Sequence, residues 1–214
     1  MNPFLLVALI LLALVSTGAY FYGSKKNRWL SSEITHQLEE VLRPSNTNYV
    51  NIGGLIGYNF TYVLGHPFIN AKGTLTLRPR HSFLYLPVSH LIGVRDRVYM
   101  NIFTKNKFSG EGHIIEESYL RKAKIDGLDS MTRSEMVQGN KRFILLWRHK
   151  NLEADLKKIL EALPEPWMLK HFCVYSETKS FYIFGIPNKN RIKELVEPIF
   201  VRLPMFLSKD KTQE

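Results

Sequence analysis

The chain has 214 residues, a formal net charge of +10 at pH 7 and one cysteine, Cys173. A single cysteine excludes an internal disulfide, so an oxidising compartment is not indicated. About 190 residues follow an apolar N-terminal segment, which is enough for one domain with a sizeable core and too few for two of ordinary size.

The N-terminal segment from Phe4 to Tyr22 contains nineteen residues without a charge and is rich in Leu, Val and Ala. As a helix it would reach roughly 28 Å, close to the hydrocarbon thickness of a bilayer. A helix is expected because the backbone in lipid must satisfy its own hydrogen bonds. Tyr20, Tyr22 and Trp29 lie at its C-terminal end, where amphipathic rings favour the membrane interface. We therefore expect a transmembrane anchor over residues 1–23.

The cationic residues behind this segment predict its orientation. By the positive-inside rule, Lys25, Lys26 and Arg28 stay in the cytoplasm, which places a short N-terminus outside and the main domain inside. The membrane would be that of the endoplasmic reticulum in a eukaryote and the plasma membrane in a prokaryote. The alternative is a cleaved signal peptide, with Thr17–Ala19 as a small-residue cleavage site. Against it, the apolar run is long and no basic side chain precedes it.

An amphipathic helix is expected over residues 24–44, between the anchor and the domain. Ser31 or Ser32 is available near its start, and Pro44 ends it. Its apolar stripe should pack on the domain while the helix carries the chain off the bilayer. The residues of this stripe are Leu30, Ile34, Leu38, Val41 and Leu42.

Residues 45–140 are expected to be rich in β-structure. Gly53, Gly54 and Gly57 indicate a bulge or turn within the first β-prone stretch. Residues 105–140 have the least regular pattern, so we expect mostly loops there and a short helix over 116–122. The strands predicted before residue 105 would form an antiparallel meander, and they lie within Tyr49–Val63, at Thr74–Arg78, at Ser82–Leu86 and over Val94–Phe103.

Residues 141–208 have the clearest pattern. They predict a strand at 141–147, a helix capped by Asn151 and extending to Leu163, strands at 170–176 and 180–186 around a turn, and a helix capped by Asn188 and kinked at Pro198. This order is a β-α-β-β-α unit with both helices on one sheet face. The core of the unit should contain Leu156, Ile159, Leu160, Phe181, Ile183, Leu195, Val196 and Ile199.

The predicted fold class is α+β: an N-terminal transmembrane helix is followed by an antiparallel β-sheet domain that ends in the β-α-β-β-α two-layer unit. The predicted organisation is an anchor (1–23), a juxtamembrane helix (24–44), a cytosolic α+β domain (45–208, with its β-rich part at 45–140) and a tail (209–214).

Positive charge is concentrated in residues 44–150, which hold fifteen basic residues against seven acidic ones, an excess of +8. Several cations stand two residues apart, and on a strand this spacing directs both side chains to one face. A surface that faces the phosphates of RNA or of anionic lipid would explain the pattern, as would an ordinary solvated sheet face. The candidate phosphate-, RNA- or lipid-facing residues are Lys72, Arg78, Arg80, Arg95, Arg97, Lys105, Lys107, Lys141 and Arg142.

No enzyme motif occurs in the sequence: it contains no phosphate-binding glycine loop, no HExxH, no GxSxG and no CxxC. The seven histidines lie singly, so each is interpreted as a surface or core residue rather than a metal ligand. Cys173 lies in an apolar stretch and should act as a small buried hydrophobe. Glu116 and Glu117 beside His113 are interpreted as solvated loop residues. We therefore expect no catalysis, metal, cofactor or small-molecule substrate.

The order of elements also resembles a known family. The juncture "GSKKNRW" after the span, followed by "FILLWRHKNLEADLKKILEAL" and "HFCVYSETKSFYIFGIPNKNRIKELVEPI", is similar to calumin, the single-pass coiled-coil-domain subunit of the PAT (protein associated with translocon) complex. The similarity covers this juncture and residues 142–203. It implies a cytosolic α+β domain at the mouth of the protein-conducting channel, which acts with the small membrane protein Asterix as a chaperone for multipass proteins.

Two departures from the family limit what the resemblance implies. The family has an acidic lumenal segment before its span, where this sequence has three residues, and a long basic helical tail that reaches the ribosome, where this sequence stops shortly after Leu207. Ribosome contact through such a tail is therefore not carried over.

Two hypotheses of function follow. The first is a membrane-protein biogenesis factor at the translocon, with the protein-conducting channel, an Asterix-like protein and ribosomal RNA as partners. The second is a membrane-anchored binding module whose basic β surface recognises anionic lipid or an acidic protein. A single membrane span is common to both.

Overall fold

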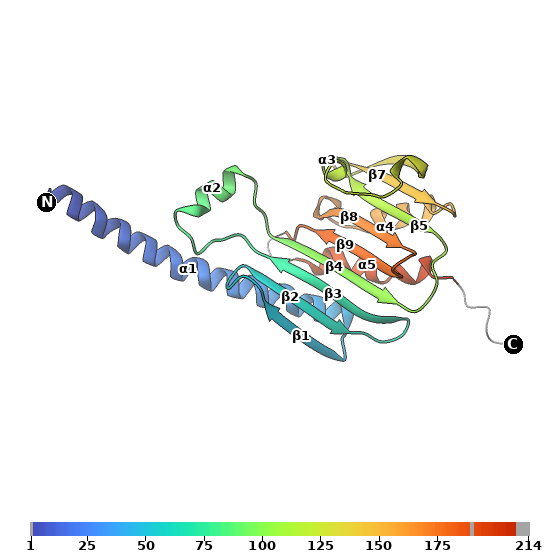
Figure 1. The fold of residues 1–214 in the computed structure, drawn as a ribbon, viewed down its shortest axis with the longest axis horizontal. Coiled ribbons are helices and arrows are strands. Elements are labelled where there is room, and N and C mark those ends of the chain that lie inside the picture. Colours follow the sequence, from blue (N-terminus) through green and yellow to red (C-terminus); the bar gives the residue numbers. More distant parts are fainter. Residues whose placement is uncertain (1, 189–190, 209–214) are drawn as a thin grey trace.

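A single helix, α1 (Pro3–Leu42), joins the apolar segment to the domain without a break (Figure 1). The computed structural model describes residues 2–188 and 191–208. The side-chain oxygen of Asn2 accepts a hydrogen bond from the N–H of Phe4 (3.0 Å), which satisfies one free donor at the helix start. In the described part of the chain, α1 is the one helix long and apolar enough to span a membrane. The expected boundary near residue 23 is thus a change of environment within one helix.

The two halves of α1 have different surroundings. Residues 3–22 are exposed or half-buried, whereas residues 23–42 bury one face against the domain. The expected stripe is confirmed, since side chains three and four positions apart lie on one face of a helix. Its buried members, none more than 4% exposed, are Leu30, Ile34, Leu38 and Leu42, and Val41 is half-buried beside them.

Within the described residues, the domain is built around one antiparallel sheet of nine strands. In chain order they are β1 (Asn46–Asn51), β2 (Gly57–Val63), β3 (Phe68–Thr76), β4 (Arg97–Thr104), β5 (Glu111–Glu116), β6 (Thr132–Gln138), β7 (Lys141–Arg148), β8 (Leu169–Tyr175) and β9 (Ser180–Gly185). Their order across the sheet is β1-β2-β3-β4-β9-β8-β5-β7-β6. The β8–β9 hairpin therefore joins the N-terminal meander to the β5-β7-β6 part of the sheet.

Helices cover the two faces of the sheet unequally (Figure 1). The remaining α-helices are α2 (Tyr85–Leu91), α3 (Glu117–Leu120), α4 (Glu153–Glu161) and α5 (Lys193–Phe200), and the 3₁₀ helices are η1 (Leu128–Ser130), η2 (Pro166–Met168) and η3 (Leu203–Phe206). The second half of α1, α4 and α5 pack on one face and enclose the main core. On the opposite face, α3 and the chain after it cover a small second cluster around Ile115 and Ile144.

The predicted core is confirmed. All eight predicted residues belong to the main cluster, and none is more than 1% exposed. The stripe of α1 joins the same cluster, so three helices rather than two cover this face. The structure also confirms the α+β class and the strand–helix–strand–strand–helix order of β7, α4, β8, β9 and α5.

Two sequence-based expectations are wrong. Residues 82–86 do not form a strand, because Tyr85 begins helix α2 instead. Pro87 stands in the first turn of this helix, where an N–H has no partner within the helix, so the proline is tolerated there. Residues 105–140 are not mostly loops, since they contain β5 and β6. The short helix expected over 116–122 is present as α3.

The two predicted helix caps differ in outcome. Leu152, not Asn151, directly precedes α4, but the side-chain oxygen of Asn151 accepts a hydrogen bond from the N–H of Glu153 (2.9 Å), the first residue of the helix. Asn188 does not cap α5, because its amide donates to the carboxylate of Glu165 (2.8 Å) and Ile192 directly precedes the helix.

The sheet has two ends that matter for function. We call the end where β4 begins at Arg97 the near end, because α1 contacts the chain there: Tyr20 packs on His81, and Asn27 donates to the carbonyl oxygen of Arg78 (2.8 Å). The opposite end, where β4 finishes at Thr104, is the far end.

Candidate anion-binding pocket

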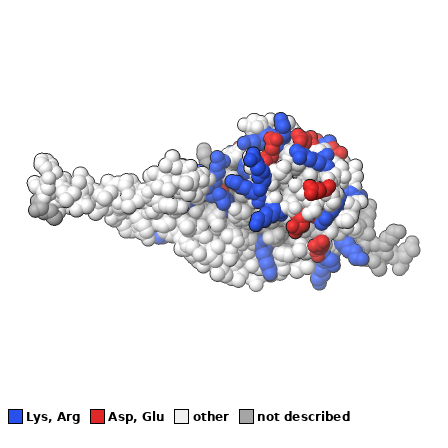
Figure 2. Space-filling view, turned by 45° about the horizontal axis from the view of Figure 1, so that its top comes forward, with Lys and Arg blue, Asp and Glu red and all other residues white. Residues whose placement is uncertain are grey.

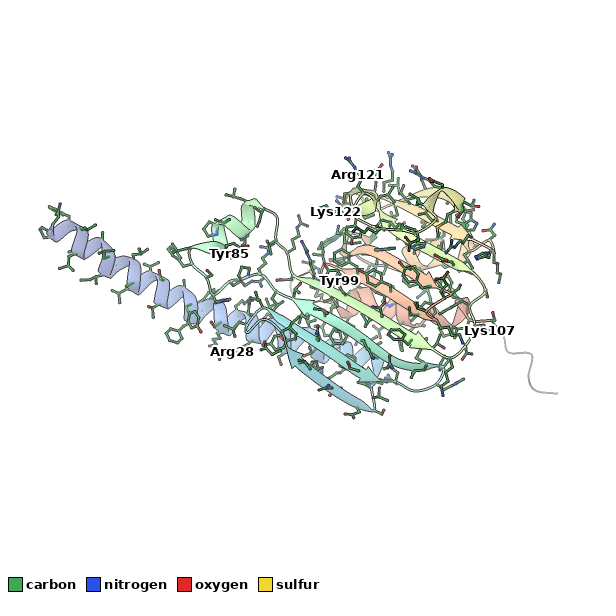
Figure 3. The ribbon with its side chains drawn as sticks, in the orientation of Figure 1. Arg28, Tyr85, Tyr99, Lys107, Arg121 and Lys122 are labelled. Carbon is green, nitrogen blue, oxygen red and sulfur yellow. The ribbon has the colours of Figure 1, made fainter. Side chains whose placement is uncertain are left out.

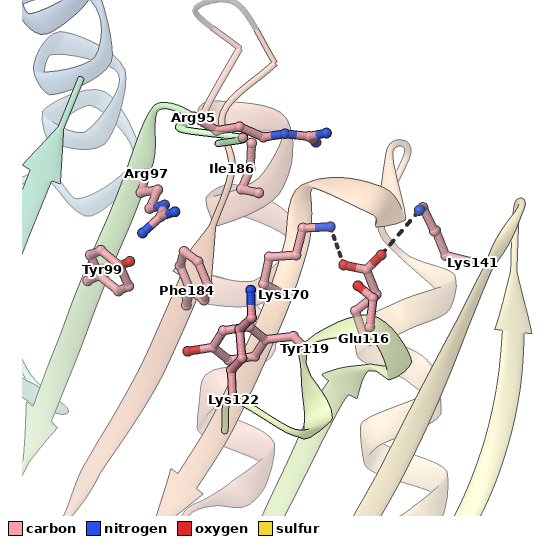
Figure 4. Close-up of a pocket in the computed structure, with 12 residues that line it drawn as sticks. Arg95, Arg97, Tyr99, Glu116, Tyr119, Lys122, Lys141, Lys170, Phe184 and Ile186 are labelled. Carbon is pink, nitrogen blue, oxygen red and sulfur yellow. Dashed lines mark hydrogen bonds and ion pairs between the residues drawn. The ribbon is translucent and has the colours of Figure 1, made fainter. Parts of the chain in front are cut away.

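An open pocket of about 480 Å³ lies at the near end of the sheet (Figure 4). The starts of β4, β7 and β8, the ends of β5 and β9, and α3 surround it. Its described lining includes five cations and one carboxylate, so positive charge predominates. These residues are Arg95, Arg97, Lys122, Lys141, Lys170 and Glu116.

Glu116 and Lys170 are the most buried charges of the pocket. They form an ion pair, and the ammonium of Lys141 approaches the same carboxylate at 3.2 Å. The register of β8 against β9 shifts between Leu169 and His171, and this bulge takes Lys170 out of the regular alternation. Burial works to raise the pKa of Glu116, but the hydrogen bonds and charges of Lys170 and Lys141 hold it below the usual value. The single carboxylate of Glu116 thus forms ion pairs with two ammonium groups.

Three further cations, Arg95, Arg97 and Lys122, are exposed and form no ion pair with any carboxylate in residues 2–188 or 191–208. Arg97 is directed to the pocket because its neighbour on β4, Val98, faces the core. A guanidinium group binds a phosphate or carboxylate through two parallel hydrogen bonds. Figure 2 shows a band of Lys and Arg on the part of the domain nearest the uncharged extension of α1.

An aromatic surface lies beside these charges. The rings of Tyr99 and Phe184, which are paired across β4 and β9, stack with centroids 4.5 Å apart. Tyr119 from α3 meets Phe184 edge-on at 5.0 Å, and burial raises the pKa of the Tyr119 phenol, so this group stays neutral. The pocket therefore combines positive charge with a neutral surface that can contact the uncharged part of an anionic ligand.

The structure divides the candidate basic residues into separate groups. Arg95, Arg97 and Lys141 line the pocket. Lys105 and Lys107 follow β4 at the far end, where Figure 3 labels Lys107 well away from Tyr99 and Lys122. Two further candidates are not part of the pocket lining: Lys72 is exposed on β3, and Arg142, the second residue of β7, is 3.6 Å from Glu117 and 4.0 Å from Glu135.

Arg78 and Arg80 belong to a clamp at the near end rather than to the pocket. The guanidinium of Arg80 donates to both carboxylate oxygens of Asp96 (2.9 and 2.6 Å) and to the side-chain oxygen of Asn27 (3.0 Å). The backbone N–H of Arg78 donates to the same carboxylate (2.8 Å), and its side chain approaches His90 (3.4 Å). The charge of Arg80 is thus engaged within the fold.

The candidate membrane-interface residues lie on α1 where its surroundings change. Lys25, Lys26, Arg28 and Trp29 are exposed, whereas Asn27 between them is fully buried. The Lys26 ammonium lies 4.3 Å from the centre of the Trp29 ring, within cation–π range. Further toward the N-terminus, the predicted interface rings of Tyr20 and Tyr22 are also exposed.

The structure brings together three residues that the sequence did not connect. His113, His171 and Cys173 are buried on the pocket side of the sheet, with possible ligand atoms within 4.8 Å of one another. His113 Nδ1 lies 3.1 Å from His171 Nε2, and His113 Nε2 lies 3.3 Å from the carboxylate of Glu111, which pairs with Arg148 (2.6 Å).

Both histidines of this group are therefore hydrogen-bonded within the core. Burial, and then the charge of His113, lower the pKa of His171 to about 3, and burial lowers that of His113 as well, so both imidazoles are neutral at pH 7. Burial also raises the pKa of the Cys173 thiol. We interpret the group as part of the core. The sequence predicted burial for Cys173 and left a surface or a core position open for each histidine.

Comparison of the whole sequence finds no matching family model and no matching curated protein. The site is consequently defined by its geometry alone. Sequence reasoning identified Arg95, Arg97 and Lys141 but missed Lys122 and Lys170. Lys122 lies in a segment without a regular apolar pattern. Lys170 faces the pocket because of a β-bulge, and the residue types of β8 do not predict this bulge.

Proposed function

We propose that this protein is a membrane-anchored, non-enzymatic binding module whose near-end pocket binds the phosphate-bearing headgroup of an anionic lipid. One observation carries the proposal: the cationic pocket lies at the end of the sheet from which the apolar half of α1 leaves the domain. If α1 spans a bilayer, this end of the domain faces the headgroups of the same membrane.

Physical considerations favour a lipid phosphate at this place. Each cation close to an anionic membrane surface contributes about 1 kcal/mol, and the attraction falls off within a Debye length, which is about 8 Å at physiological salt. Position relative to the membrane therefore matters as much as charge. Arg95 and Arg97 supply guanidinium forks that form no ion pair within the described part of the chain, and the ring of Tyr99 supplies a neutral contact beside them.

The orientation of the anchor belongs to the same proposal. Lys25, Lys26 and Arg28 follow the apolar half of α1 and are exposed, which supports a cytoplasmic domain and an N-terminus outside. In sealed inside-out vesicles, a protease should then remove the domain, and in right-side-out vesicles it should not. Protection in the opposite sense would overturn the orientation.

Selective lipid retention tests the pocket. The full chain in mild detergent, supplied with equimolar phosphatidylglycerol and phosphatidylcholine, should retain phosphatidylglycerol preferentially by native mass spectrometry. The double variant R95E/R97E should lose this preference because it reverses two guanidinium charges of the pocket. The matched variant K105E/K107E changes net charge equally at the far end and should keep it. Equal retention by all three proteins would refute lipid recognition by the pocket.

A role in membrane-protein biogenesis at the translocon is a second proposal. The observed order of β7, α4, β8, β9 and α5 is the arrangement that the resemblance to calumin implies for residues 142–203. The partners would be the protein-conducting channel, an Asterix-like protein and ribosomal RNA. Purification in mild detergent should bring down channel and ribosomal proteins under this proposal. Their absence from the purified material would leave lipid binding as the function.

A further inference from the structure

The segment that carries α2 exposes an unusual amount of apolar surface. Residues 82–94 contain no Lys, Arg, Asp or Glu. Leu91 is 87% exposed, Leu84 72% and Ile92 64%, and Phe83, Tyr85 and Val88 are exposed beside them. The one fully buried side chain of α2 is instead polar: Ser89 points inward and donates to the carbonyl oxygen of Leu86 (2.7 Å). This arrangement is the reverse of a helix packed on a water-exposed surface, where apolar side chains point inward.

Both ends of this segment are fixed to each other. The carboxylate of Asp96, just after the segment, accepts hydrogen bonds from the backbone of Arg78 and the guanidinium of Arg80, just before it. The Arg80–Asp96 pair is bidentate and largely buried, with side chains 21% and 10% exposed. The apolar residues between these positions therefore project from a rigid base.

The same base is attached to α1 at the end of its apolar half. Asn27 donates to the carbonyl oxygens of Leu55 (3.1 Å) and Arg78 (2.8 Å) and accepts from Arg80. The backbone of Arg80 approaches Gly23 so closely that a Cβ atom there would lie 2.1 Å from the Arg80 carbonyl oxygen. In Figure 1, α2 lies at the end of the domain from which α1 extends toward the N-terminus. Figure 3 labels Tyr85 of α2 in the same orientation.

We propose that the α2 segment, residues 83–92, inserts into the interfacial layer of the same bilayer leaflet that α1 enters, as a second membrane contact of the domain. The inference rests on the proposed membrane anchoring by α1 but not on what the pocket binds. We assign lipid, rather than a protein, as the partner of this segment because its base contacts residues 20–27 of α1. In this stretch of α1 the apolar residues end and the charged residues begin at Lys25.

The chemistry of the segment fits this layer. An exposed apolar patch of this kind is uncommon on a water-facing surface and marks a contact with a membrane or a protein. Backbone groups at the end of α2 find partners in the residues that follow it: the carbonyl oxygens of Val88 and Ser89 accept from the N–H groups of Ile92 (3.0 Å) and Val94 (2.9 Å), which lowers the cost of entering the interfacial layer. Tyr85 offers an amphipathic ring of the kind found at membrane interfaces, and Arg95 follows the segment at the position where a cation would meet headgroups.

Fluorescence quenching in the full chain, reconstituted in liposomes, tests the inference. Single cysteines are introduced at Leu91 in α2, at Leu11 in the apolar half of α1 and at Val201, which is 69% exposed after α5 at the far end. Cys173 is fully buried, so an uncharged fluorophore applied to the folded protein should label the introduced thiol, and the parent chain measures the background. The quenchers are lipids with a nitroxide near the headgroup or deep in the acyl chain, and aqueous iodide.

The inference expects shallow nitroxide to quench L91C, deep nitroxide to quench L11C, and iodide to quench V201C. If L91C is quenched by iodide as V201C is, while L11C responds to deep nitroxide, the anchor stands and the insertion of α2 is refuted. Protection of L91C from both kinds of quencher would mean that protein covers the segment, which also refutes insertion. If L11C responds to iodide, the anchoring itself fails and the inference fails with it.

Discussion

The near and far ends of the sheet expose different kinds of side chain. The near end carries six exposed apolar residues within 83–92 and a pocket whose described lining has five cations and one carboxylate. The far end carries a second pocket, of about 650 Å³, in which the carboxylates of Glu111, Asp126 and Glu177 outnumber two cations. The exposed apolar segment and the cation-lined pocket thus lie together where the apolar half of α1 leaves the domain, whereas the exposed cations Lys105 and Lys107 at the far end have no such apolar segment beside them among residues 2–188 and 191–208.

This difference indicates two environments on one sheet. A domain surrounded only by water gains nothing from collecting apolar and cationic side chains at one end. A domain seated on a membrane benefits from apolar surface that enters the interface and from cations at headgroup level, while its other end faces water. The contrast therefore supports the proposed seating of the near end on the bilayer.

The largest expected loss of stability comes from substitutions in the hydrophobic core between the sheet and its helices. Leu156 is fully buried and Leu195 is 1% exposed, so each Leu→Ala substitution should lower the free energy of unfolding by about 2–5 kcal/mol. Urea unfolding of the reconstituted protein measures the change. Val137→Ala on the edge strand β6, where the side chain is 65% exposed, is the matched control and should change stability by less than about 0.5 kcal/mol. Near-neutral effects at both leucines would contradict the packing described.

Two glycines of α1 provide a paired test of its two halves. Gly23→Leu should destabilise the near end by about 1–3 kcal/mol or more, because the new side chain meets the backbone of Arg80 and His81. Gly18→Leu should have little effect, since nothing lies within 4 Å of a Cβ atom there. Thermal unfolding and proteolysis of the segment between Arg80 and Asp96 measure the outcome. Similar behaviour of the two variants would disprove the tight contact at Gly23.

The sequence correctly predicted those helices and strands in which the apolar residues alone follow a regular helical or strand spacing. The stripe of α1 and the unit from β7 to α5 belong to this group, because their buried faces follow regular helical or strand spacing. Strand β5 was missed for the opposite reason. It is buried on both faces and shows no alternation, and its charges at Glu111 and Glu116 indicate a solvated loop until Arg148 and Lys170 are seen to neutralise them.

The site was only partly predictable because it is assembled by tertiary contacts. The net charge of residues 44–150 was consistent with an anionic partner or with a solvated sheet face, and Arg95, Arg97 and Lys141 were among the candidates for contact that the structure places in one pocket. Spacing along the chain could not separate them from Arg80, whose charge is engaged by Asp96, or from Lys107 at the far end. Only the sheet order, in which β4, β9, β8, β5 and β7 follow one another, distinguishes these residues.

Acid pH should destabilise the sheet face between the two pockets, where the buried pair of His113 and His171 lies. The pKa of His171 is lowered from 6.5 to about 3, and that of His113 is also lowered, so the unfolded chain binds more protons below pH 6.5. Stability should therefore be fully present above pH 6.5 and fall below it, by at most about 1.4 kcal/mol per pH unit for each histidine.

The informative range for this measurement extends from pH 6.5 down to about one unit above 4.5, the usual pKa of a glutamate carboxyl group, so that histidine titration dominates. Urea unfolding across this range should give a smaller slope for His171→Gln than for the parent chain. Equal slopes in the two proteins would mean that His171 is not held neutral in the folded state.

The smallest expected effect concerns the charge balance of the near-end pocket. Glu116→Gln removes the carboxylate shared by Lys170 and Lys141, so it should weaken the fold locally and leave both ammonium groups free for an anion. Affinity for phosphatidylglycerol should rise by up to about fivefold, or about 1 kcal/mol, the scale of one additional cation near an anionic membrane surface. Native mass spectrometry of retained lipid measures the gain. At the far end, Glu177→Gln removes the same charge and should leave retention unchanged. A loss of affinity in Glu116→Gln would indicate that the carboxylate positions Lys170 for binding, and that the pocket depends on geometry more than on net charge.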